Sequence, residues 1–240
     1  MGPQGGAALQ IGSNDGRQAD PFMEALAVRP DWRAVLVEPV PFLFERLRTN
    51  LSGRPRTTFV NAAVGDGGTS EFFWIDPDAC REHPEYPAWI LQLGSFDRRH
   101  LMSHLDGKLE PYIRSARIPT APLMDLIKSQ GISALAILHL DCEGWDWEIL
   151  RQLDFRQIMP NVILFEHKHL RPPDTSSARD FLRPHYRLFD LGCDTLALRE
   201  DVLRTTMRTP GLRGISWAMA VLPGRWADRL RRRCFPGTEV

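Results

Sequence analysis

The stretch His139-Leu-Asp-Cys-Glu-Gly144 begins at the end of the apolar run 135–140 and precedes a helical pattern that begins at Trp145. This order is typical of a buried strand that ends in a polar turn before a helix. In open α/β sheets, ligands bind beyond the carboxyl ends of the strands. The histidine and the two carboxylates of this stretch are therefore candidate site residues, and other segments should reach the same edge.

Length and composition set the outer limits of the prediction. The chain has 240 residues, enough for one sizeable α/β domain, so we expect residues 1–240 to form a single domain. Thirty basic and thirty acidic residues give zero formal charge, which argues against nucleic acid as a partner. The four cysteines form no CxxC pair, which disfavours zinc-ribbon and disulfide scaffolds.

The sequence carries no recognisable targeting or membrane signal. The first residues lack the basic segment and apolar core of a signal peptide, and no apolar run reaches 18 residues. The cysteine pattern fits a reducing compartment. We therefore expect a soluble, cytoplasmic protein with no membrane contact.

The N-terminal third predicts strand, glycine loop and helix in that order. The apolar run 7–11 is followed by Gly12-Ser-Asn-Asp-Gly16, and Asp20-Pro21 suits the start of a helix. The next apolar run, 35–37, ends in Glu38-Pro39. Glu38 lies 22 residues after Gly16, the distance at which nucleotide-binding α/β folds place an acid on the ribose.

Further strands and helices alternate along the chain. Apolar or alternating runs predict strands, and two stretches of helical period predict helices 120–130 and 176–182. This alternation predicts a mainly parallel, doubly wound sheet covered on both faces. The remaining predicted strands are 57–63, 70–75, 134–140, 161–165, 186–191, 195–198 and 215–222.

Residues 76–116 form the longest stretch of weak periodicity, so we expect a lid or substrate-binding insertion there. Aromatic and histidine side chains in and beside it are candidate substrate contacts: Trp74, His83, Trp89, His100 and His104. The basic cluster of Arg229 and 231–233 is interpreted as a solvated helix end.

The glycine loop favours a cofactor without phosphates. A dinucleotide fingerprint needs a second glycine where this chain has Asn14, so NAD(P) and FAD are disfavoured. S-adenosylmethionine has an adenosine and a sulfonium but no phosphate. Gly12 to Gly16, Glu38 and Asp141 match its methionine part, its ribose and its methyl group in that order.

Three predicted strands end in acids, namely Glu38, Asp141 and Glu166, so these acids should share one edge of the sheet. An acceptor hydroxyl must lose its proton as a methyl group is transferred, so a base must lie within hydrogen-bond reach. The candidates are His139, Asp141, Glu166 and His167, with the histidines favoured by their ordinary pKa. Alternatively, Asp141, Glu166 and His167 could hold Mg²⁺ or another divalent metal.

Five motifs follow one another along the chain: Ile11-Gly-Ser-Asn-Asp-Gly16, Val37-Glu-Pro39, Phe59-Val-Asn-Ala-Ala-Val-Gly-Asp66, Leu140-Asp-Cys-Glu-Gly144 with Glu148 and Leu150, and Leu164-Phe-Glu-His167. Together, and in this order, they resemble the FkbM-type methyltransferases over roughly residues 8–170. The resemblance implies a Rossmann-like S-adenosylmethionine methyltransferase fold with an antiparallel C-terminal strand. It also implies O-methylation of a hydroxyl on a sugar or a natural-product small molecule.

The resemblance further implies residue roles. Gly12, Ser13, Asn14, Asp15 and Gly16 would line the methionine part of the cofactor, and Glu38 with Pro39 would hold the ribose. Asn61, Ala62 and Ala63 would border the adenine, and Asp141 would lie closest to the reacting methyl group. His139 departs from the family pattern, which commonly has lysine there.

Two other functions remain open at this level. One is a non-catalytic S-adenosylmethionine or nucleoside-binding protein, and the other is a nicotinamide-type oxidoreductase. Trp145 shares a helical face with apolar residues and is expected in the core, whereas Trp147 is expected to border the pocket. The protein could also form a homodimer.

Overall fold

A computed structural model describes residues 6–17 and 20–202, and its centre is a seven-stranded sheet. The order is β10-β11-β9-β8-β1-β2-β3, with β11 antiparallel to both of its neighbours and the other pairs parallel. The predicted doubly wound, mainly parallel sheet is confirmed. The strands are β1 (Ala7–Ile11), β2 (Arg33–Val37), β3 (Thr57–Val60), β8 (Leu135–Leu140), β9 (Val162–Glu166), β10 (Tyr186–Asp190) and β11 (Asp194–Arg199).

Helices cover both faces of this sheet because successive strand side chains point to opposite sides. On one face, Ala8 of β1 packs in a cluster with residues of α1 (Pro21–Val28) and α2 (Pro41–Asn50). On the other face, Leu9 of β1 packs with the second set of helices. That set is α5 (Leu123–Ser129), α6 (Asp146–Leu150) and α7 (Pro172–Leu182).

The predicted start of the first helix is confirmed. Asp20 caps α1, since its Oδ1 accepts a hydrogen bond from the Phe22 N–H at 2.8 Å, and Pro21 takes the first helical position. The Asp20 carboxylate also accepts from Gln10 Nε2 at 2.6 Å, which links the start of α1 to β1.

A second sheet corrects two sequence predictions. The predicted strand 57–63 divides into β3 and β4 (Ala63–Val64), which lie in different sheets. The predicted helix 120–130 begins only at Leu123, because residues up to Ala121 belong to a strand. The strand order of this second sheet is β4-β7-β5-β6, with β5 (Gly68–Ile75), β6 (Gly94–Ser95) and β7 (Ile113–Ala121). The pairing of β5 with β7 spans most of both strands and is remote in sequence, so local patterns did not reveal it.

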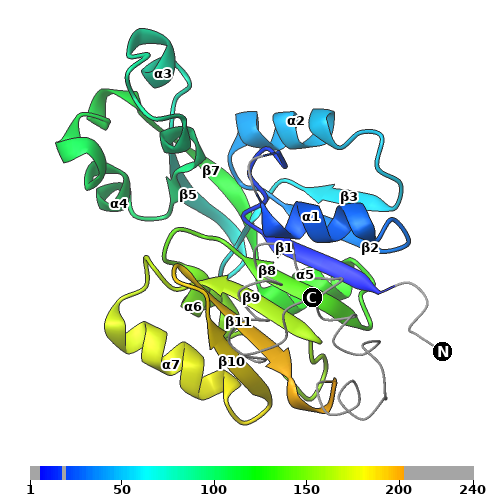
Figure 1. Ribbon diagram of the computed structural model, residues 1–240. Helices are drawn as coiled ribbons and strands as arrows, with labels where there is room; N and C mark the ends of the chain where they lie inside the picture. Colours follow the sequence, from blue (N-terminus) through cyan, green and yellow to red (C-terminus); the bar gives the residue numbers. More distant parts are fainter. Residues whose placement is uncertain (1–5, 18–19, 203–240) are drawn as a thin grey trace, which may run out of the picture.

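Of the predicted insertion 76–116, residues 76–112 form a small lobe and residues 113–116 belong to β7; Figure 1 shows the lobe raised on β5 and β7 away from the main sheet. Its helices surround an apolar core of their own that includes Ile90, Leu101 and Leu109, each fully buried. The helices are α3 (Asp78–Glu82), η1 (Ala88–Gln92), α4 (Arg98–Met102), η2 (His104–Gly107) and η3 (Glu110–Tyr112). We call residues 76–112 the lobe below.

Some predictions fall outside the described residues. The predicted strand 215–222 and the basic cluster of Arg229 and 231–233 both lie there. Among the described residues, no helix combines the length and apolar composition needed to cross a membrane.

Candidate functional site

The glycine loop lies against the ends of two neighbouring strands. The N–H groups of Gly12 and Ser13 both donate to the carbonyl oxygen of Val37 at 3.0 Å, which ties the end of β1 to the end of β2. Gly12 has φ +81°, and a side chain there would collide with the backbone carbonyl of Asp141. Glycine is therefore required for the loop to approach the end of β8.

Glu38, which follows β2 beside the glycine loop, is buried, with 3% of its surface exposed. Its Oε2 accepts a hydrogen bond from the Asn14 N–H at 2.7 Å, and its Oε1 accepts from the Val40 N–H at 2.9 Å. Burial raises the pKa of this carboxyl to about 7, although the two hydrogen bonds lower it. Asn61 Nδ2 donates to the Glu38 carbonyl at 2.8 Å and supports the same turn from β3.

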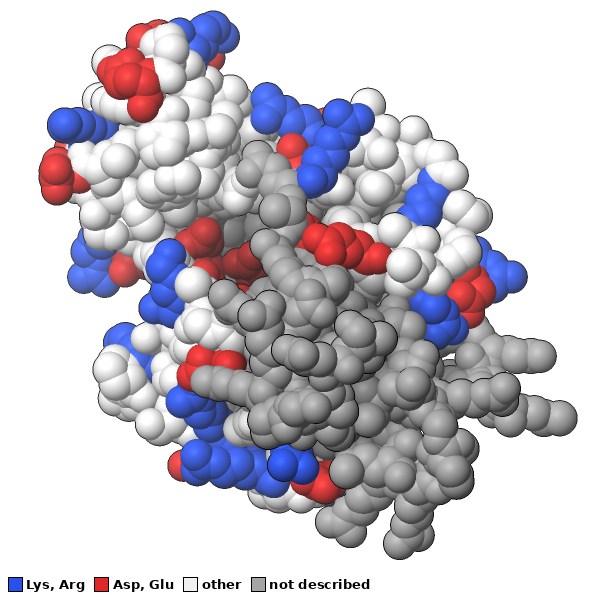
Figure 2. Space-filling model, viewed as in Figure 1, with Lys and Arg blue, Asp and Glu red and all other residues white. Residues whose placement is uncertain are grey.

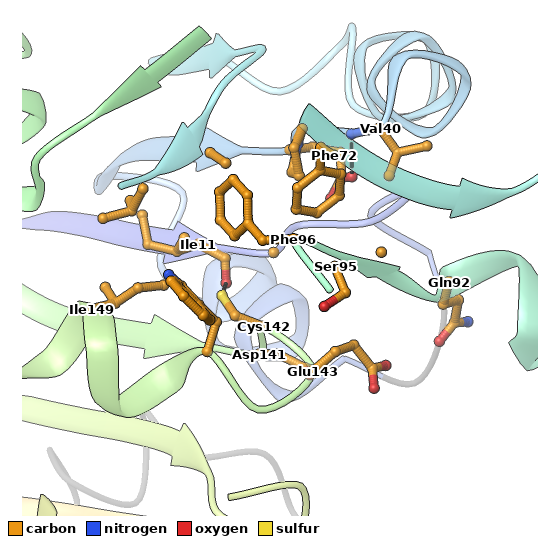
Figure 3. A pocket seen from close by; sticks show the side chains of 17 residues that line it. Ile11, Val40, Phe72, Gln92, Ser95, Phe96, Asp141, Cys142, Glu143 and Ile149 are labelled. Atoms are coloured by element: carbon orange, nitrogen blue, oxygen red, sulfur yellow. Dashed lines mark hydrogen bonds between the residues drawn. The ribbon is translucent and has the colours of Figure 1, made fainter. Parts of the chain in front are cut away.

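Two adjoining cavities open beyond the strand ends. The first spans about 520 Å³, part of it open to solvent, and apolar side chains from strands of both sheets and from the segments that follow them form most of its wall (Figure 3). The second spans about 510 Å³, also partly open to solvent, and its lining includes residues 12–17 and Asp20. Both cavities share a common set of lining residues: Gly12, Glu38, Gln92, Asp141 and Glu143.

The second cavity is rich in acids. Asp15, Asp20 and Asp141 line it with Glu38 and Glu143, and Arg17 is the basic residue of its lining. Figure 2 shows acidic side chains gathered in the hollow between the lobe and the main sheet. Crowding by surrounding protein raises the pKa of Asp141 to about 6, even though its side chain meets solvent in the cavity. Such a wall attracts a cationic ligand.

Most predicted cofactor residues line these cavities. Gly12, Ser13, Asn14, Asp15 and Gly16 line the second, Pro39 and Ala63 line the first, and Glu38 and Asp141 line both. The other two predicted residues do not: Asn61 supports the Glu38 turn, and Ala62 is 8% exposed outside the lining.

Sequence reasoning missed the aromatic wall of the first cavity. The rings of Phe72 and Phe96 meet edge to face at 5.0 Å between centroids, and Trp145 lies 5.2 Å from Phe96. Trp145 was expected in the core, yet it is 38% exposed and lines the cavity. Trp147, expected at the pocket, packs instead on Phe181 at 5.9 Å and joins the core beneath α7. Only the pairing of the second sheet brings Phe72 to this place.

His139 lies outside the lining of both cavities. Its ring is 3% exposed and stacks on Phe22 at 5.9 Å. Its Nδ1 lies 3.0 Å from Gln10 Nε2 and 3.8 Å from Asp20 Oδ1. Because strand side chains alternate, His139 points into the layer beneath α1, whereas the residues that follow the strand line the cavities. This placement favours a role for His139 in positioning Gln10 and Asp20 over direct contact with a methyl acceptor.

The predicted metal ligands do not form one group. Nδ1 of His167 lies 3.0 Å from Thr195 Oγ1 of β11, which turns this ring away from the cavities. Glu166 instead neighbours His169, whose Nε2 lies 3.7 Å from Glu166 Oε1 and 3.8 Å from Glu143 Oε2. Burial raises the pKa of Glu166 to about 9, and it lowers the pKa of His167 and of His169.

Glu143 is held in place by an unusual backbone. Its φ is +51°, and Gly144 follows with φ +90°. A side chain at Gly144 would stand 2.9 Å from the carbonyl oxygen of His169, so the turn after β8 passes close to the loop after β9. This approach brings Glu143 and His169 together.

Asp146 was also missed, although it is completely buried. Its carboxylate accepts hydrogen bonds from the N–H groups of Cys142 and Glu166, both at 3.2 Å. It therefore joins the end of β8 to the end of β9. Burial raises its pKa well above the ordinary value. A carboxylate at the first turn of a helix was visible in the sequence, but its second partner comes from another strand.

The predicted substrate contacts divide into two groups. His100 and His104 of the lobe face the loop after β9, with ring centroids 5.7 and 6.3 Å from that of His169. Trp89 packs edge-on against His104 at 5.5 Å. His83 stacks on Tyr86 within the lobe at 4.6 Å, and Trp74 packs beside the Phe72 cluster.

Solved structures with a similar chain path are methyltransferases and an RNA-processing protein. A precorrin-6y C5,15-methyltransferase from Geobacter metallireducens GS-15 has 13% identity and a TM-score of 0.40, covering 82% of each chain. A methyltransferase from Geobacter sulfurreducens has 14% identity and a TM-score of 0.41, covering 82% of this chain and 71% of that one. The fibrillarin pre-rRNA processing protein of Methanococcus jannaschii has 9% identity and a TM-score of 0.41, covering 82% and 67%. No curated protein matches the sequence.

A family match identifies the chain more directly. The model of the methyltransferase FkbM domain matches residues 10–191, which include the glycine loop, Glu38, Asp141 and Glu166. The strand order and the antiparallel β11 agree with the Rossmann-like S-adenosylmethionine methyltransferase fold expected from the resemblance. The chain therefore belongs to the FkbM methyltransferase domain family.

Proposed function

We propose that this protein is an S-adenosylmethionine-dependent O-methyltransferase that acts on a hydroxyl of a sugar or natural-product small molecule. The observation that carries the proposal is the position of Glu38. This acid is buried, is oriented by two backbone N–H groups and lines both cavities at their junction. A carboxylate held in this way suits the two hydroxyls of a ribose.

The two cavities fit the two ends of the cofactor. The apolar first cavity, with Ala63, Val64 and Phe72 in its wall, has the flat apolar surfaces that an adenine requires. The acid-rich second cavity suits the ammonium and sulfonium charges of the methionine part. Gly12 has no side chain, so the backbone of the glycine loop lies directly beside Asp141, where we place the methionine part. Glu38 then falls between the two ends, as the ribose does in the cofactor.

When bound, S-adenosylmethionine supplies a methyl group on a sulfonium leaving group. The chain's own task is to hold an acceptor oxygen in line with it and to accept the hydroxyl proton. We assign proton acceptance to Asp141, a carboxylate that lines both cavities. His139 is assigned a positioning role through Gln10 and Asp20.

The acceptor would enter between the lobe and the main sheet. Gln92 and Ser95 of the lobe lie on the same side of the first cavity as Glu143 in Figure 3. These polar groups suit a hydroxylated molecule, and the neighbouring Phe96 and Trp145 suit the face of a sugar or aromatic ring. The lobe therefore has the composition expected of a substrate lid.

Calorimetry with S-adenosylmethionine, S-adenosylhomocysteine and NAD tests the cofactor. Binding of S-adenosylmethionine and S-adenosylhomocysteine, with no binding of NAD, supports the proposal, and binding of NAD alone contradicts it.

The methyl acceptor is tested by a transfer assay. Transfer of an isotopically labelled methyl group is measured on matched panels of hydroxylated compounds and amines, and NMR identifies the methylated position of the product. N-methyl products in place of methyl ethers would overturn O-methylation, and methyl esters in place of ethers would overturn the hydroxyl as the acceptor. Cofactor binding with no labelled product from either panel would favour a non-catalytic binding protein.

A further inference from the structure

Four metal-ligating side chains meet beside the shared rim of the cavities. Glu143 comes from the turn after β8, and Glu166 ends β9. His169 comes from the loop after β9, and His100 comes from α4 of the lobe. Segments remote in sequence thus place two carboxylates and two imidazoles in one small volume. We call these four residues the Glu/His cluster.

The distances within the cluster match a shared ion better than a set of hydrogen bonds. Ligand atoms of Glu143, Glu166 and His169 all lie within 4.8 Å of one another. The closest pairs are His100 Nε2 to Glu143 Oε2 at 3.4 Å, then His169 Nε2 to Glu166 Oε1 at 3.7 Å and to Glu143 Oε2 at 3.8 Å. The two longer pairs exceed the range of a hydrogen bond. Donors about 2.1 Å from one ion stand roughly 3.0 to 3.6 Å apart, which is close to the separations of these three pairs.

Buried polar atoms without partners point to the same place. In the described part of the chain, four buried side-chain nitrogen or oxygen atoms have no hydrogen-bond partner. Two of the four are Glu166 Oε2 of the cluster and Nε2 of His104, whose ring lies 5.0 Å from that of His100. Leaving such an atom unsatisfied costs about 1–3 kcal/mol, and an ion bound by the cluster would give Glu166 Oε2 the partner that it lacks.

The burial of the donors also suits an ion. The exposed fractions of the side chains are 21% for His100, 20% for Glu143, 13% for Glu166 and 23% for His169. They are enclosed enough to exclude most bulk water, yet open enough for an ion to enter. Glu143 also lines both cavities, so an ion here would lie at their rim.

We propose that Glu143, Glu166, His169 and His100 bind one divalent first-row transition metal ion, of the class that includes Zn²⁺ and Mn²⁺. Mixed imidazole and carboxylate donors suit these ions, whereas Mg²⁺ prefers oxygen donors and retains its water. The ligands differ from the predicted set, because His169 and Glu143 replace His167 and Asp141. The inference goes beyond methyl transfer and does not depend on it, since metal content is measured directly.

An ion in the cluster would join the lobe to the main sheet. His100 belongs to α4, whereas the other three donors follow β8 and β9. In the described residues, these histidine and carboxylate contacts are where α4 approaches the loop after β9. Metal binding would therefore fix the lobe over the cavities.

Metal titration of the chelator-treated full-length protein tests the proposal. We expect calorimetry with Zn²⁺ to show one equivalent bound, Mn²⁺ to compete for it, and Mg²⁺ to bind at least 100-fold more weakly. Elemental analysis after dialysis should find about one ion per chain. Less than a fifth of an equivalent of either transition metal in the wild-type protein would overturn the proposal.

Paired variants separate this site from ordinary surface binding. His169→Ala and Glu166→Gln should each weaken Zn²⁺ binding at least 30-fold while retaining the circular dichroism spectrum and melting curve of a folded protein. His83→Ala, which removes a lobe histidine paired with Glu85, and Glu148→Gln, which breaks a pair with Arg151, should bind as the wild type does. Equal affinity in all variants would show adventitious surface binding. Should His169→Ala not fold, His100→Ala serves in its place, with the same expected loss.

Discussion

The backbone N–H of Asn14 donates a hydrogen bond to Glu38 Oε2 at 2.7 Å, which joins two turns that lie 24 residues apart. Asn14 has φ +50°, a conformation that asparagine tolerates better than most residues. With Val40 bonded to the other oxygen, two of the four lone-pair sites of the Glu38 carboxylate are used. The remaining sites are available to a ligand at the junction of the two cavities.

Glu38→Gln should weaken S-adenosylhomocysteine binding by about 10- to 100-fold, because a charged acceptor contributes about 1.5–3 kcal/mol to each hydrogen bond. The amide NH₂ would also face one of the two backbone N–H donors. Calorimetry measures the affinity. Glu45→Gln on the neighbouring α2 is a matched control, since Glu45 is exposed and pairs with Arg48. Equal affinity of the Glu38→Gln variant and the parent would refute the ribose assignment.

Cofactor affinity should rise with pH because burial raises the pKa of Glu38 to about 7 in the free protein. Below that pH the carboxyl is mostly protonated and accepts poorly from hydroxyls. The affinity should increase up to about tenfold per pH unit between pH 5.5 and 7 and then level off. Affinities measured across pH 5.5–8.5 check this, and Glu38→Gln should reduce the rise to the part that ionisation of Asp141, with a pKa of about 6, contributes. A flat profile for the parent contradicts the assignment.

The raised pKa of Glu38 makes the stability of the ligand-free protein fall with pH, whereas it makes cofactor affinity rise. A carboxyl whose pKa is higher in the folded state favours folding most when it is protonated, and that advantage is lost as pH rises from about 4.5 to 7. Bound S-adenosylhomocysteine should offset the loss by holding the ionised form. The ligand-induced rise in melting temperature should therefore be larger at pH 8 than at pH 5.5.

Gly12→Ala should destabilise the protein by about 2–4 kcal/mol, since φ is +81° and the new methyl group would meet the Asp141 carbonyl. Urea unfolding measures the change in free energy. Gly53→Ala is the matched control, because no atom lies within 4 Å of its added Cβ. Similar losses for the two variants would show that the approach of the loop to β8 is not tight.

Asp146→Ala should cost about 2–4 kcal/mol of stability, because two buried backbone N–H groups would lose their acceptor. Asp146→Asn should lose less, since its amide oxygen retains one of these bonds. Asp174→Ala, at an exposed pair with Arg171, should change stability by less than about 1 kcal/mol. An alanine variant at position 146 as stable as the parent would contradict the proposed link between β8 and β9.

His139→Ala should lower stability by about 2–4 kcal/mol, because it removes a buried ring that stacks on Phe22 and contacts Gln10. His139→Gln retains a polar partner for Gln10 and should keep most of the turnover. Melting curves and kcat distinguish this positioning role from catalysis. If His139 accepts the proton, both variants lose turnover and the glutamine variant keeps its melting temperature.

The sequence predicted those features whose signals are local. Asp20-Pro21 marks the start of α1 because the cap and the first turn are neighbours in the chain. The apolar runs marked the strands of the main sheet, and Glu38 and Asp141 lie beyond strand ends as expected. The predicted helix 120–130 is confirmed as α5, but its start was wrong, because residues 120 and 121 belong to β7, which pairs with β5 across a long separation in sequence.

The amino-acid sequence by itself determined the family motifs, the strands of the main sheet, and Glu38 and Asp141 as acids beyond strand ends, because each depends on residues that are neighbours in the chain. Only the tertiary structure decided which side chains meet. His139 turns beneath α1 because strand side chains alternate, and His167 turns toward β11, so Glu143, Glu166, His169 and His100 form the Glu/His cluster instead. Side-chain direction and the pairing of distant segments fix such contacts, and neither can be obtained from spacing along the chain.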